Sequence, residues 1–208
     1  MFLKNNCDTM KRVIASVFAA AMMFAGVDAF AQFDVDRLNV GAGWVNSTMK
    51  VKQNGNANRT TSNGFYLGAS YELPTSVANL SVDPGLYWEF LSSGGSAKLK
   101  EHYLGVPIMA KYNFDFADDT RFFAFAGPTI QLGLSSKTKS GSWTYNNYDS
   151  DYTRFDVLLG GGAGVDLMDK WQIKIGYNWG LVNRYTGDAS PKVKQHRNEV
   201  HLGVAYLF

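Results

Sequence analysis

The chain has 208 residues, a formal net charge of +2 at pH 7 and a single cysteine. A charge this close to neutral gives no electrostatic footprint for DNA or RNA, so nucleic-acid binding is excluded from the expected functions. The length suits one domain, and one cysteine cannot form a disulfide framework.

The first 31 residues have the pattern of a secretory signal peptide. Lys11 and Arg12 precede an apolar run over 13–24, and the segment 29–31 (Ala-Phe-Ala) carries small residues where a signal peptidase reads them. We therefore expect cleavage before Gln32, with residues 1–31 removed and residues 32–208 forming the mature domain.

Two further expectations concern this leader. Met10 offers an alternative start, because Met10-Lys11-Arg12 opens a signal peptide of ordinary length. Cys7 lies in the removed part, so the mature chain would contain no thiol. An uncleaved N-terminal anchor is the alternative interpretation, although the apolar run is too short to span a bilayer as a helix.

Apolar and polar residues alternate with a period of two in eight segments of the mature chain, which predicts an all-β fold. The eight predicted strands cover residues 37–51, 63–73, 80–91, 99–114, 121–134, 154–167, 171–181 and 200–208. In the fifth segment we expect Phe122 and Ile130 on the apolar face, which turns Phe123 and Phe125 towards the other face.

The connections alternate between long and short. Long polar links are predicted at 52–62, 92–98, 135–153 and 182–196, and short links at 74–79, 115–120 and 168–170. This rhythm is typical of transmembrane β-barrels, which have short turns at the periplasmic end and long external loops.

The two faces of the strands also differ in side-chain size. The polar face is rich in Gly, Ala and Ser, which suits the crowded interior of an eight-stranded barrel, whereas the apolar face carries bulky groups. Aromatic residues gather near the strand ends, as in the two girdles of a membrane barrel. They are Tyr71, Tyr112, Phe122, Trp171, Tyr206 and Phe208 at one rim and Phe65, Trp88, Phe90 and Trp179 at the other. A soluble lipocalin-like barrel also alternates and remains the alternative.

Four short motifs carry a resemblance to a known family. They are Tyr-Leu-Gly-Val-Pro-Ile-Met-Ala-Lys-Tyr at 103–112, Phe-Ala-Phe-Ala-Gly-Pro at 123–128, Gly-Gly-Gly-Ala-Gly-Val at 160–165 and the terminal Tyr-Leu-Phe at 206–208. In this order and spacing the chain resembles small outer-membrane barrels of the OmpA/OmpX type, and most closely the PorT-like outer-membrane β-barrel family.

The resemblance implies an eight-stranded antiparallel up-and-down transmembrane β-barrel in the outer membrane of a Gram-negative bacterium, monomeric and with both termini periplasmic. Its implied partners are outer-membrane lipid, lipopolysaccharide and the barrel assembly machinery. In such barrels a terminal aromatic is read during assembly, which assigns that role to Tyr206 and Phe208 here. The resemblance implies no particular activity.

Catalysis and metal binding are weakly represented in the sequence. Of the three histidines, His102 lies near the outer end of the fourth predicted strand, as do the His residues of barrels that modify lipid A, so a lipid-modifying enzyme is the alternative function. No Gly-x-Ser-x-Gly motif is present. Asp149 and Asp151 lack the other oxygen ligands of a calcium loop, and no two histidines suit one metal, so no metal or cofactor is expected.

Charged residues also fall on the inward face, where an unpaired charge would be costly. They are Glu72, Glu89, Lys111, Asp156, Lys174 and Glu199. We expect a paired network, such as Glu89 with Lys111, that fills the interior. A narrow polar conduit is the alternative.

The third long link is the most suggestive segment for binding. It combines aromatic platforms with carboxylate and amide groups, a mixture common in recognition surfaces. The candidate recognition residues are Trp143, Tyr145, Tyr148, Asp149, Asp151 and Tyr152. We therefore expect a non-enzymatic protein with a structural or surface-interaction role towards an extracellular ligand or surface protein, with a small-channel or secretion-accessory role as a variant.

Overall fold

The computed structural model describes residues 35–53, 56–94, 97–117, 119–149, 152–187 and 193–208. Two compact units are distinguished, Met1–Asp36 and Arg37–Phe208. Only Val35 and Asp36 of the first unit are described, and they open the short helix η2 (Val35–Arg37). The predicted signal peptide and its cleavage site lie outside the described residues. No helix in the described ranges has the length and apolar character needed to cross a membrane.

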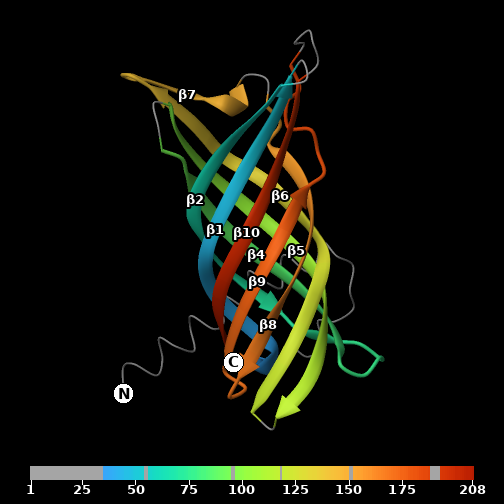
Figure 1. Cartoon of the computed structure of the whole chain (residues 1–208). Coiled ribbons are helices and arrows are strands. Elements are labelled where there is room, and N and C mark those ends of the chain that lie inside the picture. The colour runs from blue at the N-terminus through green and yellow to red at the C-terminus, as the bar shows by residue number, and fades with distance from the viewer. Residues whose placement is uncertain (1–34, 54–55, 95–96, 118, 150–151, 188–192) are drawn as a thin grey trace, which may run out of the picture. The chain divides into compact units, whose positions relative to one another are not determined.

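The second unit is a closed antiparallel barrel. Its eight long strands within the described ranges are β1 (Leu38–Gln53), β2 (Asn56–Tyr71), β4 (Leu80–Ser92), β5 (Ala97–Ala117), β6 (Thr120–Ser140), β8 (Phe155–Leu167), β9 (Trp171–Gly180) and β10 (Lys194–Leu207). Each pairs with its neighbours in the chain, and pairing of β1 with β10 closes the ring (Figure 1). Two short strands add to the barrel. β3 (Leu73–Pro74) pairs antiparallel with β4, and β7 (Trp143–Asn146) pairs antiparallel with β6.

The bulky apolar parity faces outward, as predicted. In β9, Trp171, Ile173 and Ile175 are exposed, whereas Gln172 between them is buried. In β6 the structure confirms the predicted parity, with Phe122 outside and Phe123 inside at 3% exposure. A lipocalin-like soluble barrel would hold its apolar face inward, so this arrangement rejects that alternative.

The aromatic rims are present with one exception. Tyr112, Phe122 and Trp171 are exposed at the end where the chain terminates, and Phe65 and Trp179 are exposed towards the other end. Tyr71 was also expected at the outer surface, but it is buried beside its cross-strand partner Leu38.

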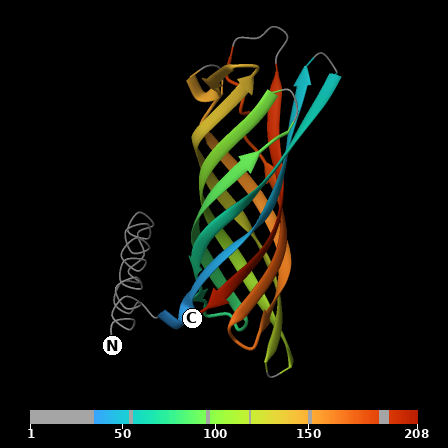
Figure 2. The same ribbon diagram turned by 90° about the vertical axis from the view of Figure 1, so that its left-hand side faces the viewer.

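The three short links predicted from the sequence lie at the end of the barrel that holds the C-terminus (Figure 2). The link predicted at 115–120 is shorter than expected, because β5 runs to Ala117 and β6 starts at Thr120. Tight turns here use left-handed backbone conformations at Asn79 (φ 62°), Met168 (φ 55°) and Asp169 (φ 51°). Asn and Asp accept this conformation more readily than other residues because their short side chains bond locally. We call this the short-turn end.

The predicted long links are wrong in extent. The expected 52–62 loop is strand almost throughout, since β1 runs to Gln53 and β2 starts at Asn56. Likewise β6 continues to Ser140 and β10 starts at Lys194. Backbone pairing does not require apolar side chains, so the ladders continue after the apolar pattern stops. Strand hairpins therefore project from the end of the barrel opposite the short-turn end. We call this opposite end the long-loop end.

Candidate functional site at the long-loop end

A buried ion network fills the interior on the side of the long-loop end. The Arg197 guanidinium lies 2.9 Å from Glu199 (Nη2 to Oε1) and 3.7 Å from Glu89 (Nη1 to Oε1). The guanidinium carbon of Arg197 lies 3.7 Å from the ring centre of Tyr103. Its Nη2 donates a hydrogen bond to the side-chain oxygen of Gln131. Arg197 and both carboxylates are fully buried, so one cation lies between an acidic group of its own strand β10 and one of β4.

A second network fills the interior on the side of the short-turn end. Lys111 Nζ contacts Glu72 at 3.0 Å and Asp166 at 3.1 Å, and lies 4.7 Å from the ring centre of Phe123. The predicted pairing of Glu89 with Lys111 is therefore wrong. In the ladder Glu89 lies opposite Tyr103, eight residues before Lys111 on β5, which puts the two charges ~26 Å apart along the strand.

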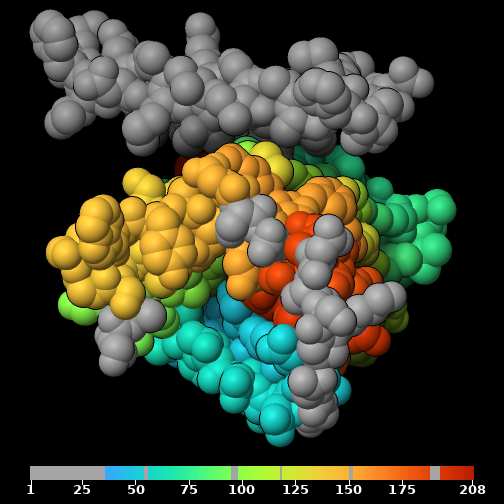
Figure 3. Space-filling view, turned by 90° about the horizontal axis from the view of Figure 1, so that it is seen from above, coloured from blue at the N-terminus to red at the C-terminus, as the bar shows by residue number. Residues whose placement is uncertain are grey.

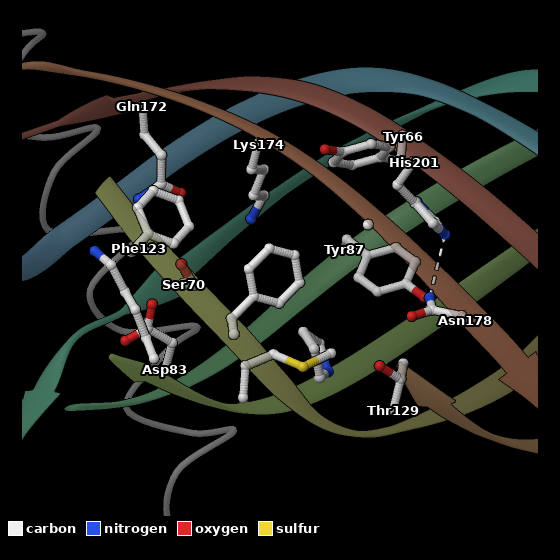
Figure 4. A pocket seen from close by; sticks show the side chains of 15 residues that line it. Tyr66, Ser70, Asp83, Tyr87, Phe123, Thr129, Gln172, Lys174, Asn178 and His201 are labelled. Atoms are coloured by element: carbon white, nitrogen blue, oxygen red, sulfur yellow. Dashed lines mark hydrogen bonds between the residues drawn. The ribbon is translucent and has the colours of Figure 1, made fainter. Parts of the chain in front are cut away.

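A cavity of about 100 Å³ remains between the two networks. Figure 4 shows Phe123, Lys174, Tyr87 and His201 around it, with the Asn178 amide hydrogen-bonded to the His201 ring at 3.2 Å. Its lining mixes aromatic and charged side chains. The interior is therefore packed at two levels, with a small hollow between them.

One carboxylate–histidine cluster in the interior has the spacing of metal ligands. Glu89, Glu199 and His201 each offer an atom within 4.8 Å of the others. Arg197 already contacts both carboxylates, and His201 Nε2 lies 3.1 Å from Glu199. The positive guanidinium beside the cluster opposes the binding of a cation.

The third long link forms a ledge on the rim. β7 turns back on β6, with Ser140 opposite Trp143 and Lys137 opposite Asn146. The turn starts at Gly141, whose φ of 61° is accessible to glycine without steric cost. Seen from above, the gold segment around β7 projects to one side of the barrel end (Figure 3). This places an aromatic segment above the rim of the barrel.

The helix η3 (Asn147–Asp149) returns the chain from the ledge to the interior. The Asn147 amide donates hydrogen bonds to Ser136 at 3.0 Å and Thr138 at 2.8 Å, which fixes the start of η3 on β6. Tyr148 is buried, and Arg184 Nη2 donates to its hydroxyl at 3.4 Å. Burial raises the pKa of the Tyr148 phenol, so the group stays neutral.

Arg184 connects the third long link to the last one. Its guanidinium lies 3.6 Å from Glu101, and its carbonyl accepts a bond from the Thr153 amide at 2.9 Å. Burial alone would lower the pKa of Arg184, but the neighbouring Tyr103 and Glu101 raise it above its ordinary value. The arginine therefore remains charged and holds two loops to the interior network.

A cleft of about 310 Å³ opens between the ledge and the hairpin of β1 and β2. Its lining includes Met49, Thr60, Tyr145, Asn147, Tyr152 and Arg184. The aromatic rings, amide, hydroxyl and guanidinium groups of this cleft can stack on and hydrogen-bond with a polar ligand.

The predicted recognition residues divide into three groups. Trp143 and Tyr145 are exposed, at 79% and 56%, and Asp149 is also exposed. Tyr148 is only 9% exposed, so it supports the loop instead of offering a binding surface. Tyr152 pairs with Tyr185 of the last loop, with ring centres 5.7 Å apart. Asp151 lies outside the described residues.

His102, the candidate of the enzyme alternative, lies on the outer surface of β5. Its ring stacks on Trp88 at 5.6 Å and lies 5.0 Å from Phe90. Ser135 stands opposite it in the ladder. Within the described ranges His102 forms no hydrogen bond and no ion pair, and its ring is held by the two aromatic contacts.

Sequence reasoning missed three members of the site. Glu101 lies inside the predicted strand 99–114 and shares the inward parity of Tyr103, so parity alone marks it. Arg197 shares the parity of Glu199, and extending the last predicted strand towards the long-loop end would have found it. Arg184 lies in an irregular loop, where no periodicity marks an inward side chain.

The two terminal aromatics lie at the short-turn end. Tyr206 is exposed, its ring is 5.1 Å from that of Phe208, and it also packs edge-on against Trp171 at 5.4 Å. The Phe208 amide donates to the Leu38 carbonyl at 3.1 Å, which joins the end of the chain to the first strand. Their role in assembly remains a prediction.

Comparison with known proteins is consistent with this architecture. The model of the family described as outer membrane protein beta-barrel domain matches residues 27–185. Among solved structures, the chain is similar to the outer membrane enzyme PagL (TM-score 0.53, 15% identity, covering 82% of this chain and 99% of that one). It is also similar to Neisserial surface protein A (TM-score 0.50, 16% identity, 82% and 97% covered). No curated protein sequence matches significantly. This fold is thus shared by an enzyme and by a surface protein.

Proposed function

The chain belongs to the outer membrane protein beta-barrel family and lies in the outer membrane of a Gram-negative bacterium, and on that premise we propose a non-enzymatic role in surface recognition. In such barrels the short turns face the periplasm and the long hairpins face outside. The cleft beside the ledge is then extracellular. The proposal is that this cleft and ledge, on a monomeric barrel, bind an external ligand.

The observation that carries the proposal is the support given to the exposed ledge. Trp143 and Tyr145 are open to solvent, yet the segment that follows them is held by buried Tyr148 and by the Asn147 bonds to β6. An aromatic surface that is exposed and also held in place loses little conformational freedom on binding, which favours affinity. A merely structural loop would gain nothing from exposing two large aromatic rings.

The chemistry of the cleft favours a sugar-containing ligand. Exposed aromatic rings suit the apolar faces of sugar rings, and the Thr60 hydroxyl with the Arg184 guanidinium suits hydroxyl groups. The packed interior argues against the small-channel variant, because eight strands leave an interior only wide enough for side chains.

Removal of the two exposed rings tests the proposal. A photoreactive residue at position 145 on intact cells should capture a glycan or a glycosylated surface molecule. Trp143→Ala combined with Tyr145→Ala should lower binding of that ligand by about tenfold or more, as expected when aromatic anchors are lost. The control is Phe116→Ala, an aromatic of 76% exposure at the opposite end, which should bind normally. Equal binding by the double variant and the wild type would contradict the proposal.

The lipid-modifying enzyme remains a second candidate because His102 and Ser135 stand opposite each other on the membrane-facing surface. Incubation of detergent-folded protein with purified lipid A distinguishes it. We expect no change in the lipid mass. A reproducible mass change that His102→Ala abolishes would replace the recognition proposal by an enzymatic one.

A further inference from the structure

Four lysines form two rungs of a ladder on the outer face of the β5–β6 hairpin. Lys98 stands opposite Lys139, and Lys100 stands opposite Lys137. All four are exposed, and with Thr144 of β7 they line a groove of about 590 Å³. Like charges directly opposite in a sheet destabilise it. Within the described part of the chain, none of the four lysines forms an ion pair, so the protein there does not offset this repulsion.

A bulge in β6 turns two of these lysines outward. His102 pairs with Ser135 and Tyr103 with Gly133, so Leu134 between them is the extra residue. A bulge of this kind shifts the side-chain alternation by one residue. On the N-terminal side of the bulge, Leu132 and the other even-numbered residues of β6 face outward. On its C-terminal side the odd-numbered residues face outward, and Ser136 is buried. Without the bulge Lys137 and Lys139 would point towards the interior.

The height of the ladder places it just above the hydrocarbon. Leu104 and Leu132 form an outward pair in the apolar band. Lys100 lies four residues further along β5 and Lys98 six, which is ~13 Å and ~20 Å along a strand. With a strand tilt of roughly 40° these distances become heights of roughly 10 and 15 Å above that pair. This is the layer of the phosphorylated sugars that carry the acyl chains of lipopolysaccharide.

We infer that this lysine ladder, Lys98, Lys100, Lys137 and Lys139, binds the phosphate groups of a lipopolysaccharide molecule lying beside the barrel. The groove faces the same side as the lipid-facing leucines below it, so a membrane lipid reaches both surfaces together. Lysine ammonium groups bind phosphate as point charges. The site lies on the opposite face of the ledge from the extracellular cleft. Its occupancy is therefore independent of the recognition proposal.

Replacement of all four lysines tests the inference. We expect the Lys→Gln quadruple variant, folded in detergent, to bind bis-phosphorylated lipid A about tenfold more weakly or worse in native mass spectrometry, since each basic residue near an anionic surface contributes to binding. The Lys→Arg quadruple variant keeps the charges and should bind as the wild type does. Lipid A stripped of its phosphates should bind the wild type and the Lys→Gln variant equally.

A stability measurement separates a loss of lipid binding from a loss of folding. Because the ladder brings like charges together, the Lys→Gln variant without lipid should unfold at the same temperature as the wild type or a higher one. If the quadruple variant does not fold, Lys98→Gln with Lys139→Gln should still weaken lipid A binding about threefold, a smaller loss for fewer charges. Binding of lipid A within twofold of the wild type by the Lys→Gln variant would overturn the inference. So would charge-dependent binding of a sulfated oligosaccharide with unchanged lipid A binding, because the occupant would then be a soluble polyanion.

Discussion

Arg197 is the residue on which charge balance in the interior depends most directly. It lies between Glu89 and Glu199 and is fully buried with them. A buried ion pair adds less stability than its geometry suggests, because both charges lose their hydration. Removing one partner of a buried pair lowers stability strongly, because the remaining charge stays buried without water and without an opposite charge.

We therefore predict that Arg197→Met destabilises the barrel by about 3–5 kcal/mol, the usual cost of breaking a buried pair. Urea unfolding in lipid vesicles, followed by tryptophan fluorescence, measures this. Arg59→Met, which changes an exposed arginine of β2, should alter stability by less than about 0.5 kcal/mol. Neutralising Glu89 and Glu199 to Gln in the Arg197→Met background should recover part of the loss. An unchanged urea midpoint for Arg197→Met alone would show that the network does not stabilise the fold.

At the scale of single residues, the sequence located most charged positions but not their partners. Parity alone placed Lys111 and Glu89 inside correctly. The choice of partner depends on height in the barrel, which is set by the stagger between strands. Lys111 instead meets Glu72 and Asp166, from the end of β2 and from β8. A one-dimensional pattern contains no information on this stagger.

At the scale of elements, strand centres could be predicted and strand ends could not. The membrane band requires bulky apolar groups at alternate positions, and this requirement is visible in the sequence. Above the band the pairing continues with polar residues, so β2 begins at Asn56 instead of the expected 63. The bulge at Leu134 changes the parity of β6 without any distinctive residue to mark it.

For the predicted recognition loop, the sequence identifies the segment but not the direction in which each side chain points. Its aromatic composition identified the segment, and Trp143 and Tyr145 are exposed as a binding surface requires. Tyr148 has the same composition signal but turns inward, because η3 changes the chain direction and Arg184 offers a partner. That partner comes from a different loop, 36 residues away.

The last strand carries a prediction about assembly. Deletion of Phe208 removes a ring that packs on Tyr206 at the membrane interface and an amide that bonds to Leu38. We expect a several-fold fall in barrel recovered from the outer membrane and more degraded or periplasmic chain, because interfacial aromatics anchor such strands. Cell fractionation and the heat-modifiable band in SDS gels measure the outcome.

The control for this prediction is Tyr145→Ala, an aromatic change in the extracellular ledge that should leave assembly normal. If the Phe208 deletion and the wild type reach the outer membrane in equal amounts, then the terminal aromatic has no role in assembly.

At the scale of the whole molecule, the arrangement of polar groups separates an interior that holds the barrel together from a mouth that is open to ligands. Arg197 and Lys111 centre two buried networks, and the cavity between them has a volume of only about 100 Å³. The groups that we propose to bind a ligand instead lie around the cleft and ledge outside. We therefore propose that activity lies at the outer surface and not in transport through the barrel.

Conductance in planar bilayers distinguishes a packed interior from an open channel. We expect no steady conductance of porin size from the purified wild-type barrel, because side chains fill an eight-stranded interior at two levels. A steady open channel that passes small sugars would contradict this expectation, and the function would then have to be sought in transport.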